Sequence, residues 1–160
     1  MNAENSELNN LSFEFFQEFS RYEYCLKMTG LCNQDGNVVA DWDKYASQVQ
    51  IDFDSPGDPR LAASIDYYIN NQPKRQNVKG GTLYWSDEPS EQGNKAVLVL
   101  MLIRRVRNNL FHGGKFNGHW FAPQRSKLLL QHGLIILKAC AENHPLVQQA
   151  YNGIEQVDEN

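Results

Sequence analysis

Residues 91–112, EQGNKAVLVLMLIRRVRNNLFH, contain the most informative helix of the chain. The first half, from Val97 to Ile103, is apolar at every position, which predicts a helix that is buried on all sides. The second half gathers arginines, asparagines and a histidine, and Gly113 and Gly114 follow as residues that end helices. The segment therefore predicts a globular helical protein with a polar site at one end of a core helix.

Apolar residues recur at helical spacing on both sides of this segment. The spacing predicts helices over 11–31, 41–49, 59–72 and 124–142, and a short last helix after Pro145. Ser12 and Asp58 are expected N-caps, and Gly30 is expected to end the first helix. We expect an all-α bundle of about five helices, with a long loop between the third and fourth. Within that loop, residues 82–85 could form a short strand.

The length of 160 residues suits a single domain spanning 1–160, with 1–10 and 152–160 as flexible tails. No apolar run approaches the length of a membrane span, and the first ten residues are polar and acidic rather than a secretory signal. We therefore expect a cytoplasmic protein. The three cysteines are odd in number and lack the spacing of a disulfide framework or a zinc site, so they are expected to be structural thiols.

The net charge of −4 hides a strong asymmetry along the chain. Residues 92–141 carry eight Lys and Arg and no Asp or Glu, whereas residues 1–91 carry seven Lys and Arg and fifteen Asp and Glu. A basic segment of this kind attracts polyanions, and nucleic acid is the commonest such partner. A solvated face, or a surface for an acidic partner, is the alternative interpretation.

The candidate catalytic residues are Arg107, Asn108 and His112. Histidine suits the base that activates the 2′-hydroxyl of ribose, and arginine suits a crowded phosphate because its planar group binds two oxygens. On an ideal helix Asn108 and His112 share a face, whereas Arg107 lies about 140° from His112. One straight helix therefore cannot easily bring both to one atom, so either the helix unwinds near Gly113 or two copies of the chain build the site.

The segment lacks the clustered carboxylates that metal-dependent cleavage requires. We expect metal-independent chemistry with no cofactor. The alternative is structural: a histidine near the helix end that caps carbonyl groups, and arginines that pair with the acidic first half of the chain.

The run Arg107-Asn108-Asn109-Leu110-Phe111-His112 resembles the motif of the HEPN domain family, an Arg followed after four to six residues by a His. The resemblance extends over about residues 11–142. It includes Phe19, Arg21, Tyr22, Glu23, Leu26 and Lys27 in the first helix, and the stretches Pro73-Lys74-Arg75-Gln76 and Leu83-Tyr84-Trp85.

This resemblance implies a HEPN-like helical bundle that forms a homodimer, in which the motifs of both copies meet in one cleft. It also implies a metal-independent endoribonuclease, either a toxin of a toxin–antitoxin pair or a phage-defence protein, with an antitoxin protein as a candidate partner. Arg107 would stabilise the phosphate, Asn108 would position it, and His112 would act as acid or base. Further RNA-binding candidates are Arg104, Arg105, Asn109, Lys115 and His119. Some HEPN toxins carry a modified tyrosine two residues after the His, but Gly114 occupies that position here.

Two other interpretations remain open. The chain could be a non-catalytic HEPN module that binds RNA, a nucleotide or a partner protein. It could also be a helical interaction protein whose basic segment pairs with its own acidic half. Trp85 and Trp120 are expected in the core or an interface, with base stacking as the alternative, whereas His132 and His144 are expected to be structural.

Overall fold

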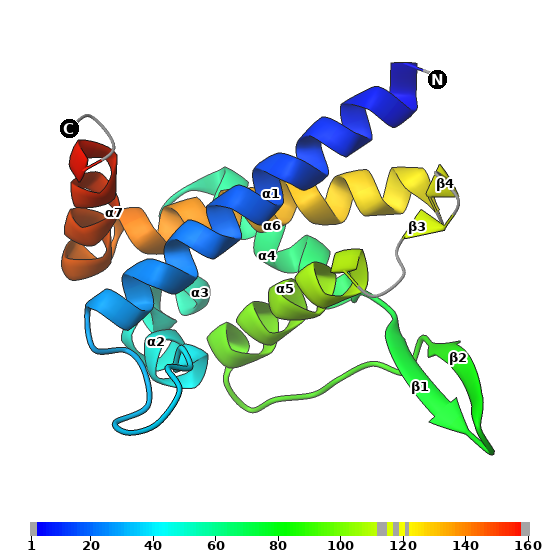
Figure 1. Cartoon of the computed structure of the whole chain (residues 1–160), viewed down its shortest axis with the longest axis horizontal. Coiled ribbons are helices and arrows are strands. Elements are labelled where there is room, and N and C mark those ends of the chain that lie inside the picture. Colours follow the sequence, from blue (N-terminus) through cyan, green and yellow to red (C-terminus); the bar gives the residue numbers. More distant parts are fainter. Residues whose placement is uncertain (1–2, 112–114, 117–118, 121, 158–160) are drawn as a thin grey trace.

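The computed structural model describes residues 3–111, 115–116, 119–120 and 122–157. Within these residues the fold consists of seven helices and two small antiparallel hairpins (Figure 1). The helices are α1 (Ala3–Met28), α2 (Trp42–Gln48), α3 (Gln50–Asp54), α4 (Pro59–Asn70), α5 (Lys95–Phe111), α6 (Pro123–Glu142) and α7 (Pro145–Val157). The expectation of an all-α fold is confirmed at this level. None of the described helices combines the length and apolarity that crossing a bilayer requires.

Local capping sets the start of several helices. The Asp58 side chain accepts a hydrogen bond from the backbone N–H of Arg60, and Pro59 occupies the first turn of α4, as predicted. The expected cap at Ser12 is wrong, because α1 begins at Ala3 and the Ser12 hydroxyl donates within the helix to the Asn9 carbonyl. Leu8 is only 2% exposed, so burial of an additional apolar turn extends the helix. Residues 50–54, which lie between the predicted helices at 41–49 and 59–72, form the short helix α3.

Helix α5 lies at the centre of the core. Its buried residues are Ala96, Leu98, Val99, Leu100, Leu102, Ile103 and Val106. The prediction of a buried first half is confirmed for most of its positions, but Val97 and Met101 are only partly buried, so the helix is not buried on all sides. The helix begins at Lys95 rather than Glu91, because the Asn94 side chain accepts a hydrogen bond from the backbone N–H of Val97. Burial of the apolar turns leaves the last two turns, from Arg104 onward, at the edge of the core.

Helices α1, α4 and α6 approach one another closely at Gly133. A Cβ atom at this position would lie 2.6 Å from the Tyr68 hydroxyl and 2.9 Å from a ring carbon of Phe15. The Tyr68 hydroxyl is fully buried and donates to the Leu129 carbonyl at 2.7 Å, so the ring cannot easily withdraw. Glycine is therefore needed here for space, in the middle of a helix.

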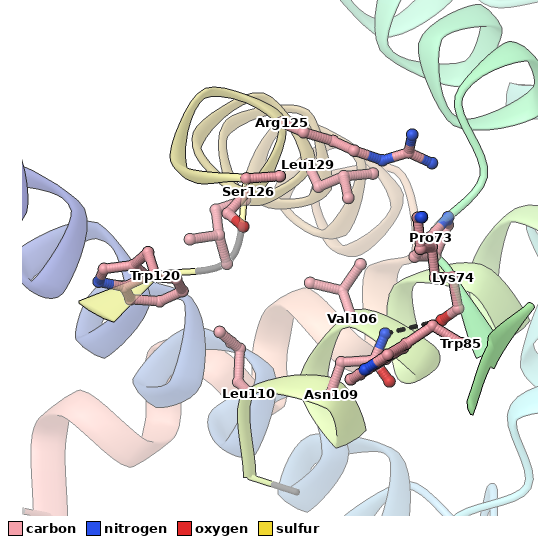
Figure 2. Close-up of a pocket in the computed structure, with 12 residues that line it drawn as sticks. Pro73, Lys74, Trp85, Val106, Asn109, Leu110, Trp120, Arg125, Ser126 and Leu129 are labelled. Carbon is pink, nitrogen blue, oxygen red and sulfur yellow. Dashed lines mark hydrogen bonds between the residues drawn. The ribbon is translucent and has the colours of Figure 1, made fainter. Parts of the chain in front are cut away.

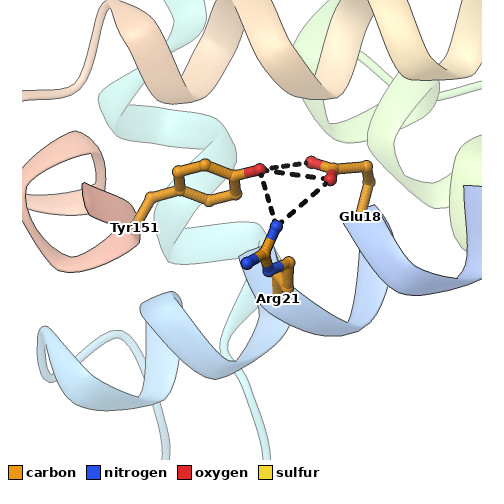
Figure 3. A network of polar contacts seen from close by, with 3 residues as sticks. All are labelled: Glu18, Arg21 and Tyr151. Atoms are coloured by element: carbon orange, nitrogen blue, oxygen red, sulfur yellow. Dashed lines mark hydrogen bonds and ion pairs between the residues drawn. The ribbon is translucent and has the colours of Figure 1, made fainter. Parts of the chain in front are cut away.

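Helix α7 is attached to α1 through Tyr151 (Figure 3). Its hydroxyl donates to the Glu18 carboxylate at 2.9 Å and accepts from the Arg21 guanidinium at 3.3 Å, while its ring stacks on Tyr22 with centroids 5.0 Å apart. The charged partners of this hydroxyl add directional contacts to the apolar packing that holds α7 on α1.

The segment between α4 and α5 is a β-hairpin rather than a plain loop. Strands β1 (Arg75–Lys79) and β2 (Thr82–Ser86) pair in antiparallel register and project from the helical body (Figure 1). Gly80 and Gly81 both adopt positive φ angles, which a tight two-residue hairpin turn requires. The predicted short strand at residues 82–85 is confirmed, and the prediction of a long loop is corrected.

We expect Gly133→Ala to destabilise the protein by about 1–3 kcal/mol, because overpacking at a closed contact outweighs the gain in helix propensity of up to about 1 kcal/mol. Chemical denaturation measures this change. The matched control is Gly153→Ala in α7, where the added Cβ meets no atom within 4 Å and should be neutral or stabilising. Equal effects of the two substitutions would contradict the close approach at Gly133.

Candidate functional site

Arg107 lies in the last turns of α5 between two aromatic rings. Its guanidinium carbon is 5.4 Å from the Phe19 ring centroid and 5.7 Å from that of Phe111. Its Nη1 donates to the Asn108 side-chain oxygen at 2.9 Å, and its Nη2 is 3.7 Å from the Glu23 carboxylate. The Arg107 side chain keeps 35% of its surface exposed, so it is anchored but open to solvent on one side.

The pairing of Arg107 with Glu23 agrees with one of the alternative interpretations, a helical interaction protein whose basic segment pairs with its own acidic half. Glu23 also accepts a hydrogen bond from the indole nitrogen of Trp42 at 3.3 Å, so the carboxylate has a second partner. The 3.7 Å between Arg107 Nη2 and the Glu23 carboxylate is longer than the roughly 2.7–2.9 Å of a close charge-assisted hydrogen bond. The pairing of Arg107 with Glu23 is therefore weaker than a close ion pair.

Arg105 and Asn109, both predicted to bind RNA, hold the base of the β1–β2 hairpin. Arg105 donates to the Pro73 carbonyl at 3.2 Å and to the Ser90 hydroxyl at 2.9 Å. The Asn109 amide donates to the Lys74 carbonyl at 2.9 Å (Figure 2). These two side chains position the segments on both sides of the hairpin, and this is a structural role that the sequence did not reveal.

Arg104 and Asn108 are exposed and lie beside a cavity of about 350 Å³ between α5 and the hairpin. We call it the arginine cavity; its lining residues are Arg75, Gln76, Met101, Arg104, Arg105, Asn108 and Asn109. Three guanidinium groups share this cavity, and its described lining contains no carboxylate. The residue that sequence reasoning did not assign to a site is Arg75, although the basic composition of residues 74–79 was a signal for it.

Two features of the arginine cavity and its arginines are electrostatically unfavourable. Burial, and then the nearby charge of Arg75, lower the pKa of Arg105 below its ordinary value. The Nε atom of Arg75 is buried and makes no hydrogen bond. Buried donors without partners and like charges at close range both cost free energy, and an anion bound in the cavity would offset the repulsion between the guanidinium groups.

A second, mostly apolar cavity of about 340 Å³ lies between α5, α6 and the hairpin, and we call it the indole pocket (Figure 2). Trp85 and Trp120 lie at its opposite ends, with Val106 and Leu129 between them and Arg125 on its α6 side. The Trp120 indole nitrogen donates to the Asn9 side chain at 3.1 Å. This volume lies within the range of small-molecule pockets, roughly 300–1,000 Å³.

The remaining predicted site residues lie wholly or partly outside the described structure. His112 directly follows the last described residue of α5 in the sequence and is outside the described residues. Lys115 and His119 belong to strands β3 (Lys115–Phe116) and β4 (His119–Trp120), which pair with each other, but their side chains are also outside the description. The assigned role of His112 therefore stays a prediction.

The other two histidines have structural partners, as expected. The Nδ1 atom of His132 is 2.9 Å from the Ser64 hydroxyl, and its ring stacks on Tyr67. Burial lowers the pKa of His132. His144 accepts a hydrogen bond from the backbone N–H of Val147 near the start of α7. Across the described residues, no three His, Cys, Asp or Glu side chains form a group that could hold a metal ion.

We expect Arg105→Ala to loosen the β1–β2 hairpin, because each hydrogen bond from a charged donor contributes roughly 1.5–3 kcal/mol. Amide hydrogen exchange of residues 75–86 should become faster. The matched control is Arg104→Ala, which removes an exposed guanidinium for which no hydrogen bond is seen in the described structure. Unchanged protection of the hairpin in the Arg105 variant would show that other contacts hold it.

Comparison with known proteins provides no assignment: no protein-family model, no curated protein and no solved structure matches this chain.

Proposed function

We propose that this protein is a metal-independent endoribonuclease of the HEPN type, with a composite site built from Arg107, Asn108 and His112 of two copies. The observation that carries the proposal is the cluster of cationic and amide side chains along the last turns of α5. Arg104, Arg105 and Asn108 line one cavity there, and Arg107 is hydrogen-bonded to Asn108 at its edge. The described lining of that cavity has no acidic side chain.

This cluster has the chemistry to bind a phosphodiester. Arginines bind planar pairs of phosphate oxygens, and amides add neutral donors that position the anion. In the proposed reaction, the 2′-hydroxyl gives its proton to His112 and attacks the adjacent phosphorus. The bond to the 5′-oxygen breaks, that oxygen takes up a proton, and a 2′,3′-cyclic phosphate remains. Arg107 stabilises the charge that develops on the phosphate oxygens.

An exposed aromatic surface beside Arg107 supports the homodimer. Phe13 of α1 is 61% exposed, Phe111 of α5 is 57% exposed, and Phe16 packs edge-on against Phe111 with centroids 5.2 Å apart. Exposed aromatic groups that adjoin one another mark interaction surfaces. A second copy docked on this surface by two-fold symmetry would bring the two Arg107 side chains toward a shared cleft. It would also remove the need for one helix to direct Arg107 and His112 at the same atom.

The ion pair between Arg107 and Glu23 favours a second candidate, a non-catalytic module that binds RNA without turnover. In this alternative Arg107 is held by Glu23 and the two flanking rings as part of the fold, and binding depends on Arg75, Arg104 and Arg105. The two candidates differ in a single observable, which is whether bound RNA is cleaved. Neutralisation through a modified tyrosine is not part of either proposal, because Gly114 occupies that position.

We expect the purified protein to cleave single-stranded RNA in EDTA and to leave a 2′,3′-cyclic phosphate, detected by mass spectrometry of the products. His112→Ala should reduce the rate by about 10²–10⁴-fold, which is typical for loss of a general acid or base. Arg60→Ala, an exposed arginine at the start of α4, is the matched control and should cleave normally. Persistent cleavage by the His112 variant would remove the assigned role of this residue, and binding without any cleavage would favour the second candidate.

We expect Phe13→Glu to convert the dimer to monomers and to abolish cleavage, while the melting temperature of the fold changes little. Light scattering coupled to gel filtration measures the mass. Val39→Glu is the control, because Val39 is 62% exposed in the turn after α1, away from this aromatic surface. A wild-type protein that is already monomeric and fully active would contradict the two-copy site.

A further inference from the structure

The indole pocket and the arginine cavity adjoin each other. The Asn109 side chain lines both, and its amide is hydrogen-bonded to the Lys74 carbonyl at the boundary between them. Lys74 and Arg75 are consecutive, yet Lys74 lines the indole pocket and Arg75 lines the arginine cavity. One residue of the hairpin base thus faces each cavity, and a single ligand could occupy both.

The two cavities differ in chemistry. The indole pocket is mostly apolar, with the Trp85 and Trp120 side chains at its ends and a few polar groups such as Ser126. This lining suits a flat, partly apolar ring that also makes hydrogen bonds. The arginine cavity is lined by three arginines and has no carboxylate among its described lining residues, and this lining suits a phosphate.

We propose that the indole pocket binds one unpaired nucleobase of RNA, and that the arginine cavity binds the phosphate next to it. This inference rests on the proposed function in taking RNA as the ligand, and it adds the form of RNA that is recognised. A base inside a double helix is stacked and paired, so it cannot enter a pocket between two helices and a hairpin without being extruded. The site would therefore select single-stranded segments or loops.

The placement also gives the hairpin a role. Trp85 and Arg75 both belong to the hairpin, and its base is held to α5 by Arg105 and Asn109. The hairpin would thus supply one stacking surface and one phosphate ligand, while α5 and α6 supply the rest. Asn109 lines both cavities, so a base in one and a phosphate in the other would lie close together. The base and the phosphate of one nucleotide are close enough to satisfy this.

The test measures binding rather than cleavage, so that it does not depend on catalysis. Three fluorescent ligands are compared by anisotropy: a short 2′-O-methyl single-stranded RNA that cannot be cleaved, the same strand in a duplex, and a polyphosphate chain of similar charge. We expect the single strand to bind roughly ten-fold or more tightly than either other ligand, because stacking of a base on an aromatic side chain contributes on that order. Equal binding of the single strand and the duplex would overturn the inference.

Two variants separate the subsites. Trp85→Leu should weaken single-stranded RNA about ten-fold and leave polyphosphate unchanged, since stacking is lost and the charges remain. Arg75→Ala should weaken both ligands and reduce the dependence of affinity on salt. Because Trp85→Leu could disturb the hairpin, Ser126→Leu fills the indole pocket from α6 instead and should give the same selective loss. Wild-type affinity for single-stranded RNA in both pocket variants would overturn the inference.

Tryptophan fluorescence provides a readout that does not depend on variants. Trp42 is buried at 3% exposure against the Phe19 ring, so a bound base can quench only Trp85 and Trp120. Quenching that disappears in Ser126→Leu supports the base subsite. If this pattern holds while no RNA is cleaved, the nuclease proposal fails and the base subsite stands. If RNA is cleaved with dependence on His112 but the pocket variants bind and cleave normally, the base subsite fails alone.

Discussion

The burial of the first half of α5 is the constraint on which the rest of the structure depends. Six of the residues before Arg104 are buried, so the helix cannot rotate or slide without exposing apolar surface to water. This burial fixes the position of the last turns of α5, which carry Arg104, Arg105, Arg107 and Asn108. Helices α1, α2, α3, α4 and α6 pack against this helix, and the hairpin is tied to its polar end through Arg105 and Asn109.

At the polar end of α5, the charge of one arginine is partly compensated within the chain, whereas the charges around the arginine cavity are not. Arg107 finds a carboxylate in Glu23 and two aromatic faces, so its charge is partly compensated within the chain. The arginine cavity has no such compensation among its described lining residues, and Arg75 and Arg105 repel each other across it. Among the described residues, the hydrogen bonds of Arg105 go to neutral acceptors, the Pro73 carbonyl and the Ser90 hydroxyl. This excess of positive charge around the arginine cavity is the physical basis for proposing an anionic ligand at this end of α5.

The features of the fold that depend on short-range patterns can be predicted from the sequence. The buried half of α5, the Asp58 cap and the strand at residues 82–85 follow from periodicity, capping chemistry and β-propensity within a few residues. The hairpin turn was missed although Gly80 and Gly81 form a recognisable signal, because the surrounding Gly, Pro, Asn and Ser residues suggested an irregular loop. The early start of α1 was missed because burial of Leu8 outweighs the polar residues around it.

Long-range pairings were not accessible from the sequence. Arg107 and Glu23 are far apart in the chain, as are Arg75 and Arg105, and no local pattern links them. The structural duties of Arg105 and Asn109 likewise appear only when the hairpin is seen against α5. The predicted site residues Arg104, Arg105, Asn108 and Asn109 do come together around one cavity. The convergence of Arg107 with His112 stays a prediction, because His112 is outside the described residues.

The most direct test of the central claim is a crystal structure of the protein bound to a short RNA with a 2′-O-methyl group at the cleavage site. The account predicts a two-fold dimer in which the phosphate next to that group lies within hydrogen-bonding distance of an Arg107 guanidinium and of a His112 imidazole. A monomer, or a phosphate that contacts neither side chain while Arg107 keeps its pairing with Glu23, would contradict it.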